Sequence, residues 1–345
     1  MREPRRAAGL ASEKICRRGT ARRSSFLLLL SALLYFWPSA SVSALVIEDY
    51  RPCFHAYQES GGTLRVAWRQ FQENGTPHFL VMDPVRVETE KVPRRDIERK
   101  SPAGSHRWEG TPFAGALARY SAPPHPLQNA GIRRAEGPAR EYFLTVDLCP
   151  SRTPLDRGFF RKIAGFAAES GTAVPVGVAA SGLWIKNHPE DFRWLVDLGR
   201  APAGGLRITW INHSYSHPFD PSAPVERNFL LRPGVDLSFE VLEAEKILLQ
   251  HGLVPAPYFR FPGLVSDRLR VESLREWLLL PVGAGAWMGK GETAKPGDII
   301  LVHGNGNEPR GVRELYRLLD RLRSEGGRAA VFLPLAAAIT GQTAP

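Results

Sequence analysis

From residue 142 to the C-terminus, stretches typical of β-strands alternate with stretches typical of α-helices. The expected strands are residues 142–148, 174–179, 206–211, 258–261, 279–283, 298–302 and 329–333. The expected helices are residues 155–170, 190–198, 236–250, 267–278 and 312–323. This alternation is typical of parallel βαβ units with right-handed crossovers. Seven such strands favour an α/β fold in which the sheet curls into a (β/α) barrel, at residues 141–345.

Two further regions precede the expected barrel. Residues 45–100 form a small β-rich segment, in which strand-like runs at 63–71 and 78–87 are joined through Asn74-Gly75, a strong hairpin-turn signal. Residues 101–140 are rich in Pro, Gly, Ala and Arg without a clear period, which predicts a linker or a wrapped loop. At about 150 residues per domain, 345 residues allow two domains or one large barrel with an appendage.

Residues 1–44 carry the features of an export signal. Basic residues up to Arg23 precede an apolar run at 26–37, and small residues through Ala44 follow it. A membrane-spanning helix needs about 20 apolar residues, so a cleaved signal peptide is favoured over an N-terminal anchor. A membrane tether through residues 26–46 stays open. Either outcome places residues 45–345 outside the cytoplasm, in the periplasm or the extracellular space.

Removal of residues 1–44 would change both the net charge and the number of cysteines. Residues 1–44 contribute +6 of the formal net charge of +10, so the remainder is only modestly basic and needs no nucleic-acid partner. Cys16 leaves with the signal, and the exported part keeps Cys53 and Cys149. An oxidising compartment permits a disulfide between these two. Two unpaired buried thiols are the alternative.

Polar residues stand where the expected strands end, which is where chemistry sits in such barrels. They are Asp147, His213, His217, Arg260, Trp287 and His303. A catalytic zinc site uses about three protein ligands drawn from His, Cys, Asp and Glu. The His213 and His217 pair therefore indicates half of a metal site, although a spacing of four alone also suits structural hydrogen bonding.

Four stretches at these strand ends read Thr145-Val146-Asp147-Leu148-Cys149-Pro150, His213-Ser214-Tyr215-Ser216-His217, Arg260-Phe261-Pro262-Gly263 and Leu301-Val302-His303. In order and spacing they resemble the motifs of NodB-like polysaccharide deacetylases, or carbohydrate esterase family four. The resemblance covers roughly residues 141–340. It implies a distorted (β/α) barrel of about seven parallel strands, a divalent metal expected to be zinc, and hydrolysis of acetyl groups from acetylated sugars.

The resemblance also implies a role for each matched residue. His213 and His217 bind the metal, Asp147 takes a proton from water as general base, and His303 protonates the departing amine. Arg260 pairs with Asp147, and an opposite charge favours the ionised carboxylate. Each has a plainer interpretation as well: Asp147 as a helix cap or ion pair, and Arg260 and His303 as structural hydrogen-bonding groups.

Two motifs depart from the family pattern. The family usually reads Thr-Phe-Asp-Asp-Gly, in which the second Asp binds the metal, whereas Leu148 and Cys149 replace that Asp and the Gly. In the fourth motif no Asp precedes Trp287, so we expect His303 to lack its usual tuning partner.

The loss of the ligand Asp leaves three arrangements open. The metal is held weakly by His213, His217 and waters; or Asp147 turns to bind it and stops acting as a base; or Cys149 supplies a thiolate.

Two functions from different classes follow. The first is an exported, metal-dependent deacetylase that cleaves the amide C–N bond of acetylated sugars, with Trp287 and Tyr215 as candidate substrate contacts. Because no Asp precedes Trp287, core packing is favoured for this residue over a role in the acetyl pocket. The second is a catalytically impaired protein of the same fold that binds carbohydrate or acts as a scaffold. A protein with a structural zinc is disfavoured, because no Cys/His cluster has the spacing of a closed site.

Overall fold

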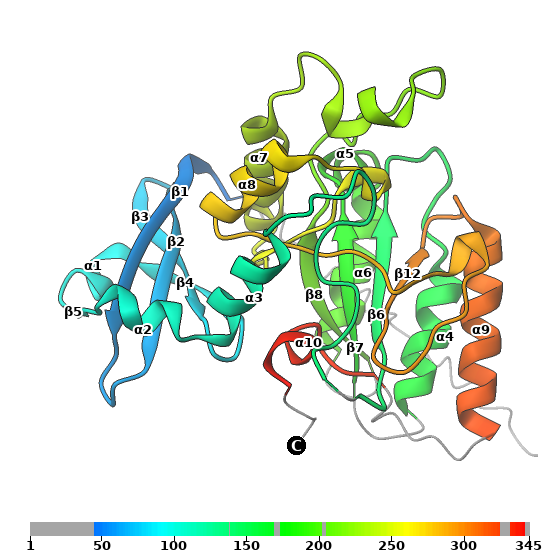
Figure 1. Ribbon diagram of the computed structural model, residues 1–345, viewed down its shortest axis with the longest axis horizontal. Helices are drawn as coiled ribbons and strands as arrows, with labels where there is room; N and C mark the ends of the chain where they lie inside the picture. Colours follow the sequence, from blue (N-terminus) through cyan, green and yellow to red (C-terminus); the bar gives the residue numbers. More distant parts are fainter. Residues whose placement is uncertain (1–44, 138, 169–172, 202–204, 325–331, 342–345) are drawn as a thin grey trace, which may run out of the picture. The chain divides into compact units, whose positions relative to one another are not determined.

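The computed structural model describes residues 45–345 except 138, 169–172, 202–204, 325–331 and 342–345 (Figure 1). The predicted signal or anchor at residues 1–44 therefore lies outside the described residues. No helix in the described part of the chain is long and apolar enough to cross a membrane.

An antiparallel sheet of five strands comes first, in the order β4-β3-β2-β1-β5. The strands are β1 (Ile47–Gln58), β2 (Leu64–Glu73), β3 (Thr76–Asp83), β4 (Glu88–Pro93) and β5 (Ser101–Pro102). The predicted hairpin is confirmed: Glu73 pairs with Thr76, and Asn74 and Gly75 form the turn with φ of 49° and 74°. Two successive left-handed residues match the twist of the strands, which is why Asn-Gly suits this position.

A second sheet has seven parallel strands in the order β10-β9-β8-β7-β6-β12-β11. The strands are β6 (Phe143–Leu148), β7 (Val174–Ala180), β8 (Leu206–Asn212), β9 (Tyr258–Phe259), β10 (Leu280–Pro281), β11 (Ala286–Trp287) and β12 (Ile299–His303). The predicted α/β class and strand number are confirmed. The seventh strand is β11, however, and not the expected strand at residues 329–333. Of that stretch, Phe332 makes a single bridge to Tyr142, and 329–331 lie outside the described residues.

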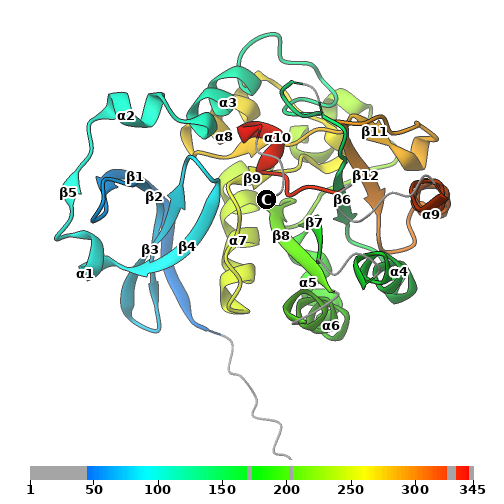
Figure 2. The same cartoon turned by 90° about the horizontal axis from the view of Figure 1, so that it is seen from below.

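Helices cover the outer face of the parallel sheet (Figures 1 and 2). They are α4 (Arg157–Ala168), α5 (Gly182–Asn187), α6 (Pro189–Arg200), α7 (Leu237–Gln250), α8 (Arg268–Glu276) and α9 (Pro309–Ser324). The connecting segments contain the 3₁₀ turns η1 (Val225–Arg227), η2 (Phe229–Leu231), η3 (Pro262–Leu264) and η4 (Met288–Lys290). Side-chain caps fix where helices start: Asp236 accepts from Ser238 N and Phe239 N, and Asp267 accepts from Arg270 N. Such caps satisfy amides that have no partner within the helix.

The stretch at residues 101–140, expected to be a linker or wrapped loop, contains helices as well. They are α2 (Ser105–Glu109) and α3 (Pro112–Tyr120). Two further short helices lie outside this stretch, α1 (Arg94–Ile97) and α10 (Ala337–Thr340). The start of α3 carries a readable signal, because Thr111 caps it and Pro112 occupies its first turn.

Residues 128–135 run between β10, an edge strand of the parallel sheet, and the start of β12. Ile132 N donates to Pro281 O on β10 at 3.0 Å, and Ile299 N on β12 donates to Arg133 O at 2.9 Å. Backbone hydrogen bonds of this segment therefore connect two strands that are not neighbours in the sheet.

The antiparallel sheet packs on the barrel through α7, which lies between β1 and β8 in Figure 2. The contact contains a fully buried ion pair, Arg69 Nε to Glu245 Oε2 at 2.7 Å. Glu245 also accepts from Tyr50 Oη at 2.7 Å and from Asn212 Nδ2 at 3.2 Å. Burying two charges is costly unless their hydrogen bonds are satisfied, and here the carboxylate has several donors.

We expect Arg69→Met to reduce the free energy of unfolding by about 3–5 kcal/mol, because it strands a buried carboxylate. Arg94→Met is the matched control, since it breaks the exposed Arg94–Glu98 pair and should cost less than about 1 kcal/mol. Denaturant unfolding measures both. The double variant Arg69→Met/Glu245→Leu should recover part of the loss. Equal effects of Arg69→Met and Arg94→Met would contradict a central role for the buried pair.

Candidate metal centre and catalytic cavity

Parallel register brings the site together at the carboxyl ends of the strands. Asp147, the penultimate residue of β6, lies opposite His303, the last residue of β12. His213 follows β8 directly, and Arg260 follows β9. A cavity of about 700 Å³ opens at this edge. Its walls contain Asp147, Cys149, Pro150, His213, His217, Phe219, Phe229, Gly263, Leu264, Trp287, Leu301, His303, Asn307 and Glu308.

Arg260 is fully buried and sits behind the cavity. Its Nη1 lies 3.3 and 3.4 Å from the two carboxylate oxygens of Asp147, and its Nη2 donates to Thr145 Oγ1 at 2.8 Å. Thr145 Oγ1 in turn donates to Ile300 O at 2.6 Å. The structure thus places Arg260 as the partner of Asp147, as the motif resemblance implies.

His213 is oriented by the backbone of Arg260. Its Nδ1 lies 2.8 Å from Arg260 O, a carbonyl that can only accept, so Nδ1 carries the proton. Nε2 then carries the lone pair; it lies 3.8 Å from Asp147 Oδ2 and 3.4 Å from Cys149 Sγ. Burial lowers the pKa of His213 below its ordinary value, which favours the neutral ring. A neutral imidazole with its lone pair directed inward is the form that binds metals.

The loop that carries His217 is held by hydrogen bonds from two sides. Ser214 Oγ accepts from His217 N at 3.1 Å, and Glu240 on α7 accepts from Ser216 N at 2.8 Å. Ser214 and His217 both have left-handed φ values, 62° and 46°. Non-glycine residues in this region cluster at functional sites. His217 Nε2 is buried and has no hydrogen-bond partner in the described part of the chain.

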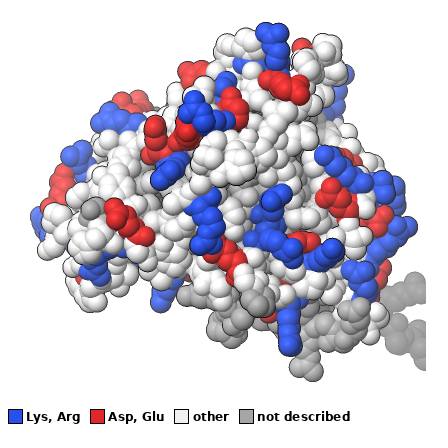
Figure 3. Space-filling model, in the orientation of Figure 1, with Lys and Arg blue, Asp and Glu red and all other residues white. Residues whose placement is uncertain are grey.

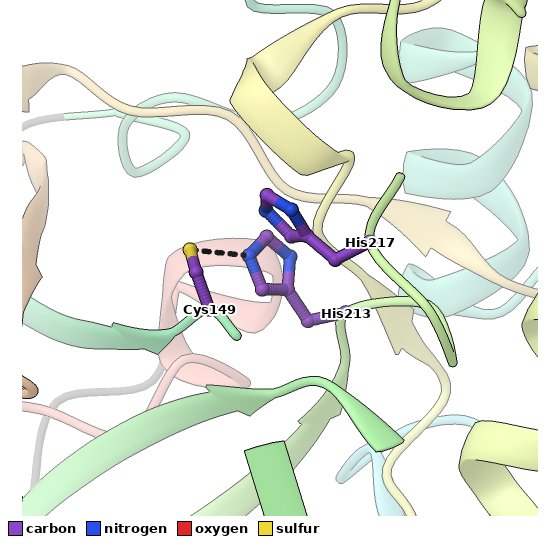
Figure 4. Close-up of side chains that lie close together, drawn as sticks. All are labelled: Cys149, His213 and His217. Carbon is purple, nitrogen blue, oxygen red and sulfur yellow. Dashed lines mark hydrogen bonds between the residues drawn. The ribbon is translucent and has the colours of Figure 1, made fainter. Parts of the chain in front are cut away.

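Cys149 lies beside the two histidines (Figure 4). Its Sγ is 3.4 Å from His213 Nε2, and the ligand atoms of Cys149, His213 and His217 all lie within 4.8 Å of one another. Burial raises the pKa of the Cys149 thiol, but His217 and His303 more than offset it, so that the pKa falls to about 6. Three donors at these distances fit a divalent metal of the zinc type.

Leu148 does not occupy a position at the metal. It is fully buried in the apolar core between the sheet and the helices, together with residues of α4 such as Phe159 and Phe160. Successive strand residues point to opposite faces, so Asp147 and Cys149 face the cavity while Leu148 faces away. The interpretation that position 148 lies at the metal, where the family has its ligand Asp, is therefore wrong for this chain.

The expected Cys53–Cys149 disulfide does not form. Both thiols are free: Cys149 is buried at the cavity, whereas Cys53 lies on β1 and packs against the small core of the antiparallel sheet. Burial raises the pKa of Cys53 to about 11, the reverse of the direction at Cys149. The alternative of two unpaired thiols describes the structure.

His303 has a carboxylate partner that the sequence motifs did not indicate. Glu308, in the loop after β12, lies with Oε2 at 2.9 Å from His303 Nδ1 and accepts from Trp287 Nε1 at 2.7 Å. The expectation that His303 lacks a tuning partner is therefore wrong. Gly289 makes room for this contact, because a Cβ there would lie 1.8 Å from Glu308 Oε2. Burial lowers the pKa of His303, but Cys149 and Glu308 raise it well above its ordinary value.

The two candidate substrate contacts fall in different places. Trp287 is part of the cavity wall, with Lys290 Nζ 4.0 Å from its ring centroid. Tyr215 is not among the cavity residues; its ring packs edge-on against Phe239. The cavity has instead two aromatic residues that sequence analysis passed over, Phe219 and Phe229, stacked at 5.2 Å. The sequence signal for Phe219 was its place two residues after His217.

No protein-family model matches the chain. Among solved structures, it is similar to a family 4 carbohydrate esterase from Bacillus anthracis, with 20% identity, coverage of 68% of this chain and 94% of that one, and a TM-score of 0.45. PdaA of Bacillus subtilis, another family 4 carbohydrate esterase, has 15% identity, coverage of 70% and 92%, and a TM-score of 0.47. A CE4 family pseudoenzyme from Bacillus anthracis has 15% identity, coverage of 62% and 70%, and a TM-score of 0.42. At these levels of similarity, any reaction proposed for this chain has to be argued from its own residues.

We expect Leu148→Asp to destabilise the protein by several kcal/mol, because it places an unpaired carboxylate in an apolar core. Zinc affinity should not rise. Leu148→Met is the control, since a volume-conserving apolar exchange usually costs less than about 1.5 kcal/mol. Melting temperature and zinc titration of both variants test this. Tighter zinc binding with unchanged stability in Leu148→Asp would show that position 148 does reach the metal.

Proposed function

We propose that this protein is a metal-dependent carbohydrate deacetylase that hydrolyses the amide bond of N-acetylated sugars. One observation carries the proposal: Asp147, His303 and the two histidines, which come from three separate strand ends, line a single cavity, and Arg260 from a fourth strand end holds Asp147 from behind. Core packing or capping would not require these polar groups to share one cavity. Perturbed titratable groups gathered in a cavity are typical of an active site.

A divalent cation, when bound, supplies polarisation of the acetyl carbonyl and of an attacking water. Cys149, His213 and His217 would hold it. Asp147 accepts the water proton, and Arg260 orients its carboxylate. Cys149 and Glu308 raise the pKa of His303 well above its ordinary value, which favours the protonated ring. Its Nδ1 is engaged by Glu308, so Nε2 is the atom that donates a proton to the leaving amine.

The cavity wall suits an acetylated sugar. Its lining combines apolar side chains, among them Leu264, Leu301, Phe219 and Phe229, with the polar groups of the site. Ligand sites are commonly built in this way, with apolar walls and few convergent polar groups. Trp287 also lines the cavity, and its orientation is fixed by the hydrogen bond that its ring N–H donates to Glu308.

A carbohydrate-binding protein without activity is the second candidate. The absence of the second Asp of the family's first motif favours it, because a metal bound too weakly without that carboxylate would leave the cavity as a sugar site only. Acetate release from acetylated chitooligosaccharides, measured with and without added zinc, separates the two. Binding of the oligosaccharide without acetate release would assign the chain to the second class.

Variants of three histidines test the assigned roles. His303→Ala should keep the metal and reduce turnover by roughly 10²- to 10⁴-fold, as expected for a lost acid catalyst. His217→Ala should lower the zinc content itself. His251→Ala, at the exposed end of α7, is the control and should change neither. Equal zinc loss from His303→Ala and His217→Ala would reassign His303 as a ligand.

Export of residues 45–345 to the periplasm or the cell exterior is part of the proposal, on the basis of the basic, apolar and small-residue segments in 1–44. N-terminal sequencing of the mature protein should begin close to Leu45. A cytoplasmic product that retains Met1 would overturn this part without affecting the chemistry.

A further inference from the structure

We propose that Cys149 is the third protein ligand of the metal, so that the centre is a Cys-His-His site. The inference rests on the proposed function and names the ligand set of that same cavity. Figure 4 shows the three side chains, drawn from the end of β6 and from the loop after β8, directed toward a common point.

The separations match what a metal imposes. Zinc bonds of about 2.3 Å to sulfur and about 2.0–2.1 Å to nitrogen in a tetrahedral site place the two ligand atoms roughly 3.6 Å apart. Cys149 Sγ and His213 Nε2 are 3.4 Å apart. The pair needs almost no movement to take up a common ion.

His217 gives an independent observation. Its Nε2 is buried and without a partner in the described part of the chain, and buried polar atoms are rarely left so. His217 also belongs to the same cluster as Cys149 and His213, whose ligand atoms all lie within 4.8 Å of one another. A metal among the three satisfies the nitrogen that no protein group satisfies.

The alternative ligand, Asp147, is already engaged. Its two oxygens face Arg260 Nη1 at 3.3 and 3.4 Å, and it is not part of the three-residue cluster. Turning Asp147 onto the metal would leave the fully buried guanidinium of Arg260 without its counter-charge, which is costly. Thiolate at Cys149 therefore leaves Asp147 free to act as the base.

The ligand type predicts the metal. Thiolate with imidazole suits zinc, whereas Mg²⁺ and Ca²⁺ require oxygen ligands. Three protein ligands also leave one position of a tetrahedral site open, as in catalytic zinc centres. The full chain should thus bind zinc or cobalt in preference to magnesium or calcium.

X-ray absorption of the zinc-loaded protein tests the ligand set directly. We expect one sulfur at about 2.3 Å together with nitrogen or oxygen at about 2.0–2.1 Å. Cys149→Ser should abolish the sulfur shell, and Cys53→Ser, which removes the other thiol of the exported chain, should leave it intact. With cobalt in place of zinc, the thiolate charge-transfer absorption should follow the same pattern.

Thiol labelling gives a second readout that does not depend on activity. Zinc should protect Cys149 from alkylation, and His217→Ala should remove that protection. A zinc site with only nitrogen and oxygen neighbours, or unchanged labelling of Cys149 in the presence of bound zinc, would overturn the inference. Neither result would decide against a deacetylase, because acetate release is measured separately. Conversely, a sulfur shell without acetate release would support the Cys-His-His site and contradict the proposed deacetylase activity.

Discussion

The buried ion pair between Arg260 and Asp147 is the interaction on which the rest of the site depends. The side chain of Arg260 fixes the carboxylate of Asp147, and its backbone carbonyl fixes the ring of His213. One residue therefore sets the position of the proposed base and the tautomer of a proposed ligand. A charge with no exposed surface is stable only with a counter-charge nearby. The stability of the fold around Arg260 therefore depends on Asp147, the proposed base. The same dependence explains why Asp147 is poorly suited to change roles.

A second support reaches the site through α7. Glu240 accepts from the backbone of Ser216 between the two histidines, and Glu245 joins Arg69 of the antiparallel sheet to Asn212, which precedes His213. The N-terminal sheet is thereby tied to the strand end that presents the first histidine. This gives a physical role to residues 45–100 for which the sequence offered none. Metal ligands generally need such outer partners to hold their orientation.

Sequence analysis predicted the fold and the strand-end residues because both follow from periodicity: parallel strands end at one edge, and polar residues after apolar runs have to gather there. It missed Glu308, since that carboxylate comes from a loop five residues beyond His303 and only the folded loop brings it back to the ring. Tyr215 was a candidate substrate contact, yet its ring packs on Phe239. Loop conformation, which local pattern does not encode, decides both cases.

The replacement at the first motif was read from the sequence as a lost ligand, and the geometry gives it another meaning. Alternation along β6 turns Leu148 into the core and returns the next residue, Cys149, to the cavity. A thiolate carries the same single negative charge as the carboxylate that the family uses, so a Cys-His-His centre has the same net charge as an Asp-His-His centre. What differs is softness, which favours zinc over magnesium and calcium and makes the ligand open to oxidation. In the proposed centre, the charge that would acidify a bound water is kept while the choice of metal narrows. On that proposal the departure from the family pattern is a change of ligand, while Asp147, His303 and Arg260 keep the positions that the motif resemblance implies.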